Sequence, residues 1–210
     1  MSPMRSRDRI GFVWRFLVCL LVLMPLASHF APVVATALLP AMKAELGWLD
    51  ENYNILDMQV RQQGSDSSVW MQVGQAHSIV IGERVFMPDP RGRATASTLL
   101  GNAALPVVLI LSCVLAAPFR QARTSTERAV KLGLYRALAT GVACVVVLAT
   151  DVPFTLWASI WGIHMDIAQP DRFSPLLIWR DLLNGGGRLA LGMGLGLAIA
   201  WLTMDRCSDA

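Results

Sequence analysis

The stretch FLVCLLVLMPLASHFAPVVATALLPAM occupies residues 16–42 and contains no Asp, Glu, Lys or Arg. A transmembrane helix needs only ~20 consecutive apolar residues, because the hydrocarbon core is ~30 Å thick. This run is therefore long enough to cross a membrane with some tilt. A cleaved signal peptide is the alternative, since small residues lie near Ala27 and Ala35. Apolar signal segments are usually ~7–15 residues long, so the length favours an uncleaved span.

The composition of the whole chain is that of a membrane protein. Of its 210 residues, 54% are hydrophobic and 16% are charged, and the mean hydropathy is +0.49. Soluble globular domains carry roughly 25% charged residues. The hydrophobicity excludes a disordered chain, and four cysteines in this length exclude a disulfide-rich scaffold. The sequence predicts an α-helical integral membrane protein.

Three further apolar runs follow the first, and together they predict four transmembrane helices with a small β-rich extracytoplasmic segment between helices 1 and 2. The predicted division is a basic N-terminus (1–15), a first span (16–42), the β-rich segment (43–94), a second span (95–119), a basic loop (120–136), a third span (137–161), an outer loop (162–181), a fourth span (182–204) and a tail (205–210).

Basic residues set the predicted orientation. Segment 1–15 has four arginines, and segment 120–136 has five basic residues against one acid. Segment 43–94 has five basic and seven acidic residues. Because loops rich in Lys and Arg stay in the cytoplasm, we expect both termini and 120–136 to be cytoplasmic. Segments 43–94 and 162–181 then lie on the outer side.

Segment 43–94 has the alternation of β-strands. Apolar and polar residues alternate in 54–61 and again in 68–73, and the turn-forming cluster 62–67 separates them. This pattern predicts a hairpin. The runs 79–81 and 84–87 add one or two strands. We expect either a small self-contained cap or a sheet whose exposed edge binds an extended peptide.

Ionisable residues inside predicted spans are the candidate functional residues, because they are costly in lipid. Asp151 lies in the third span and Arg188 in the fourth. We consider a structural ion pair between them, snorkelling of one or both to the interface, and a role in transport or catalysis. His29, in the first span, is either a hydrogen-bonded packing residue or a proton carrier.

Small residues and cysteines in the spans predict packing. Gly192 and Gly196 form a GxxxG pair, a spacing that lets helices approach closely. A dinucleotide site is not expected there because no strand precedes it. No GxSxG, HExxH, P-loop or CxxC motif occurs, and we expect no cofactor, no metal and no nucleic-acid partner. The cysteines lie within predicted spans or in the tail, where we expect no extracytoplasmic disulfide: Cys19, Cys113, Cys144 and Cys207.

The order of these features resembles the small membrane proteins encoded beside exosortases, the exosortase H-associated group in particular. The matching features are the Arg-flanked first run, the strands within 55–87, TLLGNAALP at 98–106, the basic turn 120–136 and NGGGRLALG at 184–192. They cover most of the chain and consist of architecture without a diagnostic motif, so no residue roles are carried over. The resemblance implies a non-catalytic accessory role in surface-protein sorting at the bacterial inner membrane.

Three classes of function follow from these features. The first is a non-enzymatic accessory subunit that contacts the lipid bilayer and a membrane-protein partner or another copy of itself. The second is a small transporter or channel component that acts as an oligomer. The third is a membrane enzyme whose outer site is built from Asp151, His164, Asp166 and Arg188.

Overall fold

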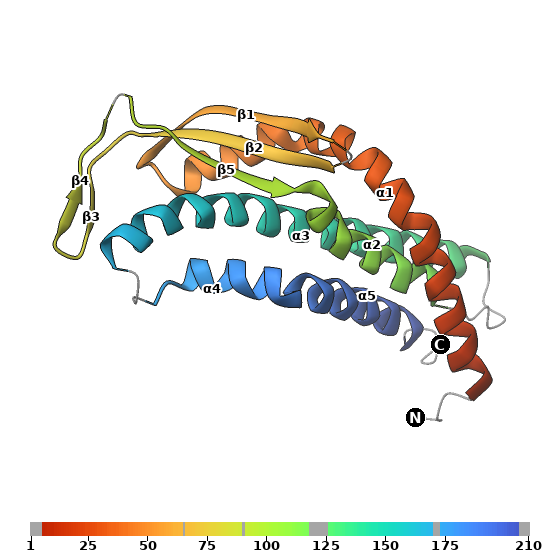
Figure 1. Ribbon diagram of the computed structural model, residues 1–210. Helices are drawn as coiled ribbons and strands as arrows, with labels where there is room; N and C mark the ends of the chain where they lie inside the picture. Colours follow the sequence, from red (N-terminus) through yellow and green to blue (C-terminus); the bar gives the residue numbers. More distant parts are fainter. Residues whose placement is uncertain (1–5, 65, 90, 118–125, 170–172, 206–210) are drawn as a thin grey trace. The chain divides into compact units, whose positions relative to one another are not determined.

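The computed structural model describes residues 6–64, 66–89, 91–117, 126–169 and 173–205 (Figure 1). The chain divides into two compact units. We call them the helical unit and the sheet unit. The helical unit comprises Met1–Ala27, Ala104–Leu148 and Arg188–Ala210, and the sheet unit comprises Ser28–Ala103 and Ala149–Gly187.

Helices make up most of the chain, and three of them are long and apolar enough to cross a membrane: Ile10–Leu49, Val130–Ala168 and Pro175–Thr203. This confirms the prediction of an α-helical chain suited to a membrane. The helices are α1 (Ser6–Leu49), α2 (Leu100–Ala116), α3 (Thr126–Ala168), α4 (Pro175–Leu182) and α5 (Arg188–Asp205). Between α4 and α5 lies η1 (Leu183–Gly187), a kink in which Gly186 has a φ of 108°.

The helix ends differ from those expected. α1 continues to Leu49 and α3 begins at Thr126, inside the expected loop 120–136. Both extensions lack proline and are rich in Ala, Leu, Lys and Glu, which favour helix. The expected outer loop 162–181 contains the end of α3 and most of α4. The N-terminal residues 1–5 and the tail from 206, which includes Cys207, lie outside the described residues.

The predicted small β segment is present, with one strand more than expected. β1 (Tyr53–Gln63) and β2 (Asp66–Gln75) form the hairpin, and β3 (Ile79–Ile81) pairs with β4 (Arg84–Phe86). Residues 95–99, expected in the second span, belong instead to β5 (Ala94–Leu99). Its sequence ATASTL alternates and pairs with β2, giving the antiparallel order β1-β2-β5.

The turn between β1 and β2 is tighter than the cluster 62–67 predicts. Gly64 has a φ of 66°, a conformation that side chains disfavour. The strands therefore extend to Gln63 and from Asp66, and these two residues face each other across the hairpin. The strand before the turn is irregular between Ile55 and Asp57, where a β-bulge shifts the register.

One face of the sheet packs on helix segments of the same unit. Val69, Met71 and Val73 of β2 are between 0% and 3% exposed. They share a core with α1 and α3, which lie along the sheet in Figure 1. The helix residues in this core repeat at helical spacing, so each helix presents one face: Ala35, Met42 and Leu46 from α1, and Val152, Leu156 and Ile160 from α3.

In the helical unit, α5 packs closely on α2 through the predicted glycine pair. A Cβ on Gly192 would lie 2.8 Å from the backbone of Pro106, and one on Gly196 would lie 2.7 Å from the Cβ of Cys113. Neither distance leaves room for a side chain. Gly194, between them, has nothing within 4 Å of the same position. The two glycines therefore set how near α5 comes to α2.

Arg136 also joins two helices of this unit. It is buried in α3, although the sequence placed it in a cytoplasmic loop. Its Nη2 donates hydrogen bonds to the carbonyl oxygens of Val114 and Ala117, at the C-terminal end of α2. The last carbonyls of a helix lack partners within the helix and carry partial negative charge. Arg136 thus caps α2 from a neighbouring helix.

We predict that Gly192→Ala and Gly196→Ala destabilise the helical unit, because each new methyl group overlaps α2. Overpacking of this kind typically costs ~1–3 kcal/mol. The measurement is thermal unfolding of the detergent-solubilised protein. Gly194→Ala is the matched control and should leave the melting temperature unchanged or raise it, since alanine favours helix over glycine. Equal behaviour of all three variants would contradict the packing role.

Candidate functional site

The two predicted intramembrane charges are both buried. Asp151, on α3 in the sheet unit, is 2% exposed, and Arg188, the first residue of α5 in the helical unit, is 5% exposed. Thr155, one turn further along α3, donates a hydrogen bond of 3.2 Å to Oδ1 of Asp151. Their pairing, snorkelling of one or both to the membrane interface, and a role in transport or catalysis stay predictions.

The two expected roles of His29, a hydrogen-bonded packing residue and a proton carrier, both stay predictions. Its side chain is exposed on α1, and its ring meets the ring of Phe30 edge-on with 5.1 Å between centroids. The sequence placed it correctly on a helix but could not show which face of the helix packs. In the sheet unit, the packed face of α1 contains Ala35, Met42 and Leu46, and His29 is not among those core residues.

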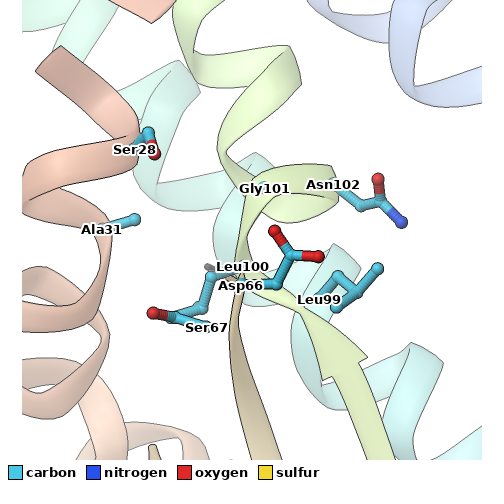
Figure 2. A pocket seen from close by; sticks show the side chains of 8 residues that line it. All are labelled: Ser28, Ala31, Asp66, Ser67, Leu99, Leu100, Gly101 and Asn102. Atoms are coloured by element: carbon cyan, nitrogen blue, oxygen red, sulfur yellow. The ribbon is translucent and has the colours of Figure 1, made fainter. Parts of the chain in front are cut away.

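A polar pocket lies where β5 runs directly into α2 (Figure 2). Its volume is about 200 Å³. Figure 2 shows the carboxylate of Asp66 directed toward the first turn of α2 and Ser28 facing the pocket from α1. The lining residues are Ser28 and Ala31 from α1, Asp66 and Ser67 from β2, and Leu99, Leu100, Gly101 and Asn102 from the junction of β5 with α2.

Helix polarity explains the position of Asp66. The first turn of a helix has N–H groups without partners inside the helix and a partial positive charge, so a nearby carboxylate is stabilised. The pairing of Ser68 with Leu99 brings the start of β2 beside the start of α2. The pocket therefore offers one carboxylate, two hydroxyls and one amide to a small polar group.

A second polar cluster ties the end of α3 to the sheet. The hydroxyl of Tyr53 on β1 lies 3.0 Å from Nδ1 of His164, and that nitrogen lies 3.3 Å from the carbonyl oxygen of Ile160. The ring of Phe86 on β4 meets the His164 ring edge-on, with centroids 5.1 Å apart. Asp166, the other residue in the predicted enzyme site, is exposed. His164 therefore holds three elements of the sheet unit together.

Asp50 supports the same cluster from the end of α1. Its Oδ2 accepts a hydrogen bond of 3.0 Å from the indole N–H of Trp157, and its Oδ1 accepts one from the backbone N–H of Asn52. Burial, together with the nearby negative charge of Asp50, raises the pKa of Tyr53 above its usual range. The phenol therefore stays protonated and able to donate.

Sequence reasoning missed most of this cluster. Tyr53 and His164 are 111 positions apart, and a pair so distant leaves no local pattern. Two weaker signals existed: Tyr53 directly precedes the first alternating run, and His164 is one of only three histidines. Within the described ranges, no three His, Cys, Asp or Glu side chains gather as a metal site requires.

We predict that the sheet unit loses stability at alkaline pH through Tyr53. The unfolded phenol ionises at a pKa of about 10, whereas the folded one resists ionisation. The contribution is therefore complete below pH ~10 and is lost as the pH rises above it, at up to ~1.4 kcal/mol per pH unit. Tyr53→Phe should flatten this decline in a series of thermal melts between pH 8 and 11. Parallel declines in both proteins would contradict the assignment.

Comparisons with protein-family models, with curated proteins and with solved structures find no match to this chain.

Proposed function

We propose that the chain is a non-enzymatic accessory subunit of a bacterial inner-membrane complex. Its four apolar helices anchor it, both termini are cytoplasmic, and the sheet unit faces outward, where it contacts a partner. The architectural resemblance to exosortase-associated proteins makes surface-protein sorting the process we favour. The observation that carries the proposal is that two helices are far longer than a bilayer is thick and end in a unit built around a sheet.

Helix lengths support this placement. α1 has 44 residues and α3 has 43, which at ~1.5 Å per residue gives ~65 Å each. About 30 Å suffices to cross the hydrocarbon core, so roughly half of each helix extends beyond it. α2 and α5 have 17 and 18 residues, or ~26 Å, slightly less than the thickness of the hydrocarbon core. α5 gains length from the segment before it, because the apolar stretch Pro175–Thr203 runs through α4 into α5.

Acidic and basic residues are distributed unevenly between the two units. The sheet unit contains eleven of the fifteen acidic residues, whereas the helical unit contains eleven of the eighteen basic ones. Basic residues flanking spans remain in the cytoplasm. An outward sheet unit and cytoplasmic basic ends satisfy both observations. Trp48, 84% exposed on the last turn of α1, adds an aromatic side chain on the outer part of that helix.

The edge strand β5 supports a partner-binding role. Proteins usually protect an exposed edge strand with charged residues or proline. The six residues of β5 include neither. The opposite edge, β1, has such protection in its bulge and in Asp57 and Arg61. Among the described residues, no backbone hydrogen bond joins the outer edge of β5 to another element. An extended segment of a partner could add there as a strand.

Orientation is tested with cysteine labelling. Glu83 is exposed in the turn between β3 and β4 and accepts a cysteine without disturbing the core. We expect a membrane-impermeant maleimide to label Glu83→Cys in right-side-out membrane vesicles. The native Cys207 should react only after the vesicles are opened. Labelling of Cys207 in sealed vesicles, with Glu83→Cys protected, would place the sheet unit in the cytoplasm and contradict the proposal.

Partner binding is tested by affinity purification from gently solubilised native membranes. We expect a stoichiometric membrane protein to co-elute. Ser97→Lys puts a charge in β5 and should reduce co-elution about tenfold, the effect of losing ~1.4 kcal/mol. Ser78→Lys, at an exposed position outside the strands, is the matched control and should not. Elution of a homo-oligomer without a partner would overturn the accessory role and favour transport through an oligomer.

A further inference from the structure

An apolar groove runs between α3 and α4 within the sheet unit. Its volume is about 450 Å³, inside the range of ~300–1,000 Å³ typical of ligand sites. Three aromatic rings dominate its walls. The lining residues are Thr150, Phe154 and Trp157 from α3, and Pro175, Leu176 and Trp179 from α4.

The two helices come together at Gly162, beside the groove. A Cβ on Gly162 of α3 would lie 3.4 Å from Leu177 and from Arg180 of α4, so α4 rests on α3 at ordinary contact distance there. About two turns before Gly162, the rings of Phe154 and Trp157 on α3 line the groove. Their centroids are 6.3 Å apart and their planes meet at 70°. The bulk of these rings gives the groove its width.

The groove offers almost no hydrogen-bonding groups. The indole N–H of Trp157 is already bonded to Asp50, so this residue presents only its ring. Thr150 is the one lining residue with a hydroxyl, and the lining has no charged side chain. A peptide bound here would leave its own N–H and C=O groups without partners, which is costly. A hydrocarbon chain has no such groups to satisfy.

We propose that this groove binds one acyl chain of a phospholipid. Both of its helices belong to the apolar segments Val130–Ala168 and Pro175–Thr203 that are suited to cross a membrane. This inference rests on the membrane placement proposed above. Counted from Val130 at ~1.5 Å per residue, Thr150 lies ~30 Å along α3, so the groove begins at the outer boundary of the hydrocarbon core, where an acyl chain of the outer leaflet can enter it. The bound chain lies between Trp157 and Trp179, and its contacts with two facing walls distinguish it from the lipid that surrounds any span.

The test uses the full chain in vesicles of phosphatidylcholine that carries a photoreactive diazirine on one acyl chain. After irradiation, mass spectrometry locates the labelled residues. We expect the label to concentrate on Phe154, Trp157 and Leu176, above the labelling of Ile163 and Ile178, which are exposed on the same two helices. Labelling in proportion to exposure would overturn the proposal. A free fatty acid carrying the same diazirine should label the groove less, because the proposed ligand is the intact phospholipid.

Matched variants separate the groove from general lipid contact. Leu176→Trp fills the groove and should lower labelling of Phe154 about tenfold, the effect of losing contact with roughly two buried methylene groups. Ile178→Trp adds the same ring on the exposed face of α4 and should not. Thr150→Leu narrows the groove from α3 and replaces Leu176→Trp if that variant does not fold. Unchanged labelling with the groove filled would overturn the proposal. A chain that does not float with the vesicles would instead overturn the membrane placement.

Discussion

The packing of the sheet on α1 and α3 is the interaction on which the sheet unit depends. A three-stranded sheet with one apolar face has little stability alone, and an apolar helix that continues beyond a bilayer must bury its apolar side elsewhere. The helices stabilise the sheet by covering its apolar face, and the sheet in turn buries the apolar faces of the helices. Val69 of β2, fully buried, lies in the same core as Met42 of α1 and Leu156 of α3.

Polar contacts then fix this arrangement in a single register. Tyr53 joins β1 to His164, and Asp50 joins the end of α1 to Trp157. Buried polar groups are costly unless they are bonded, so alternative placements of the sheet that break these bonds are disfavoured. The apolar core provides most of the driving force, and the polar contacts select one geometry. Because the indole N–H of Trp157 donates to Asp50, only the ring of Trp157 lines the groove.

The sequence predicted those features that leave a pattern within a few neighbouring residues, and it missed most of the others. Alternation over a few residues predicted β1 and β2 well, because a strand with one buried face repeats every two positions. The ends of α1 and α3 were missed. Apolar content indicates which residues can lie in lipid, but it does not indicate where the helix ends. β5 was assigned to a span because Ala, Thr and Ser suit both. The glycine pair was found because its spacing is local.

The candidate site shows the same limit. Asp151 and Arg188 are both buried, and their pairing stays a prediction. The role of Arg136 depends on where α2 ends, and the Tyr53–His164 contact joins residues from opposite halves of the chain. No pattern within a single helix or strand contains that information. These contacts become visible only in the folded structure.

The direct passage from β5 to α2 also bears on how this chain can change by insertion. Leu99 ends the strand and Leu100 begins the helix, with no loop residue between them. An added residue there would rotate α2 by ~100° relative to the strand and displace every side chain beyond it. An insertion in the turn between β3 and β4 rotates no helix. Gly82 and Glu83 are exposed there and join two short strands. Divergent relatives should therefore vary in length at 82–83 and keep their length at 99–100, and epitope tags belong in the former.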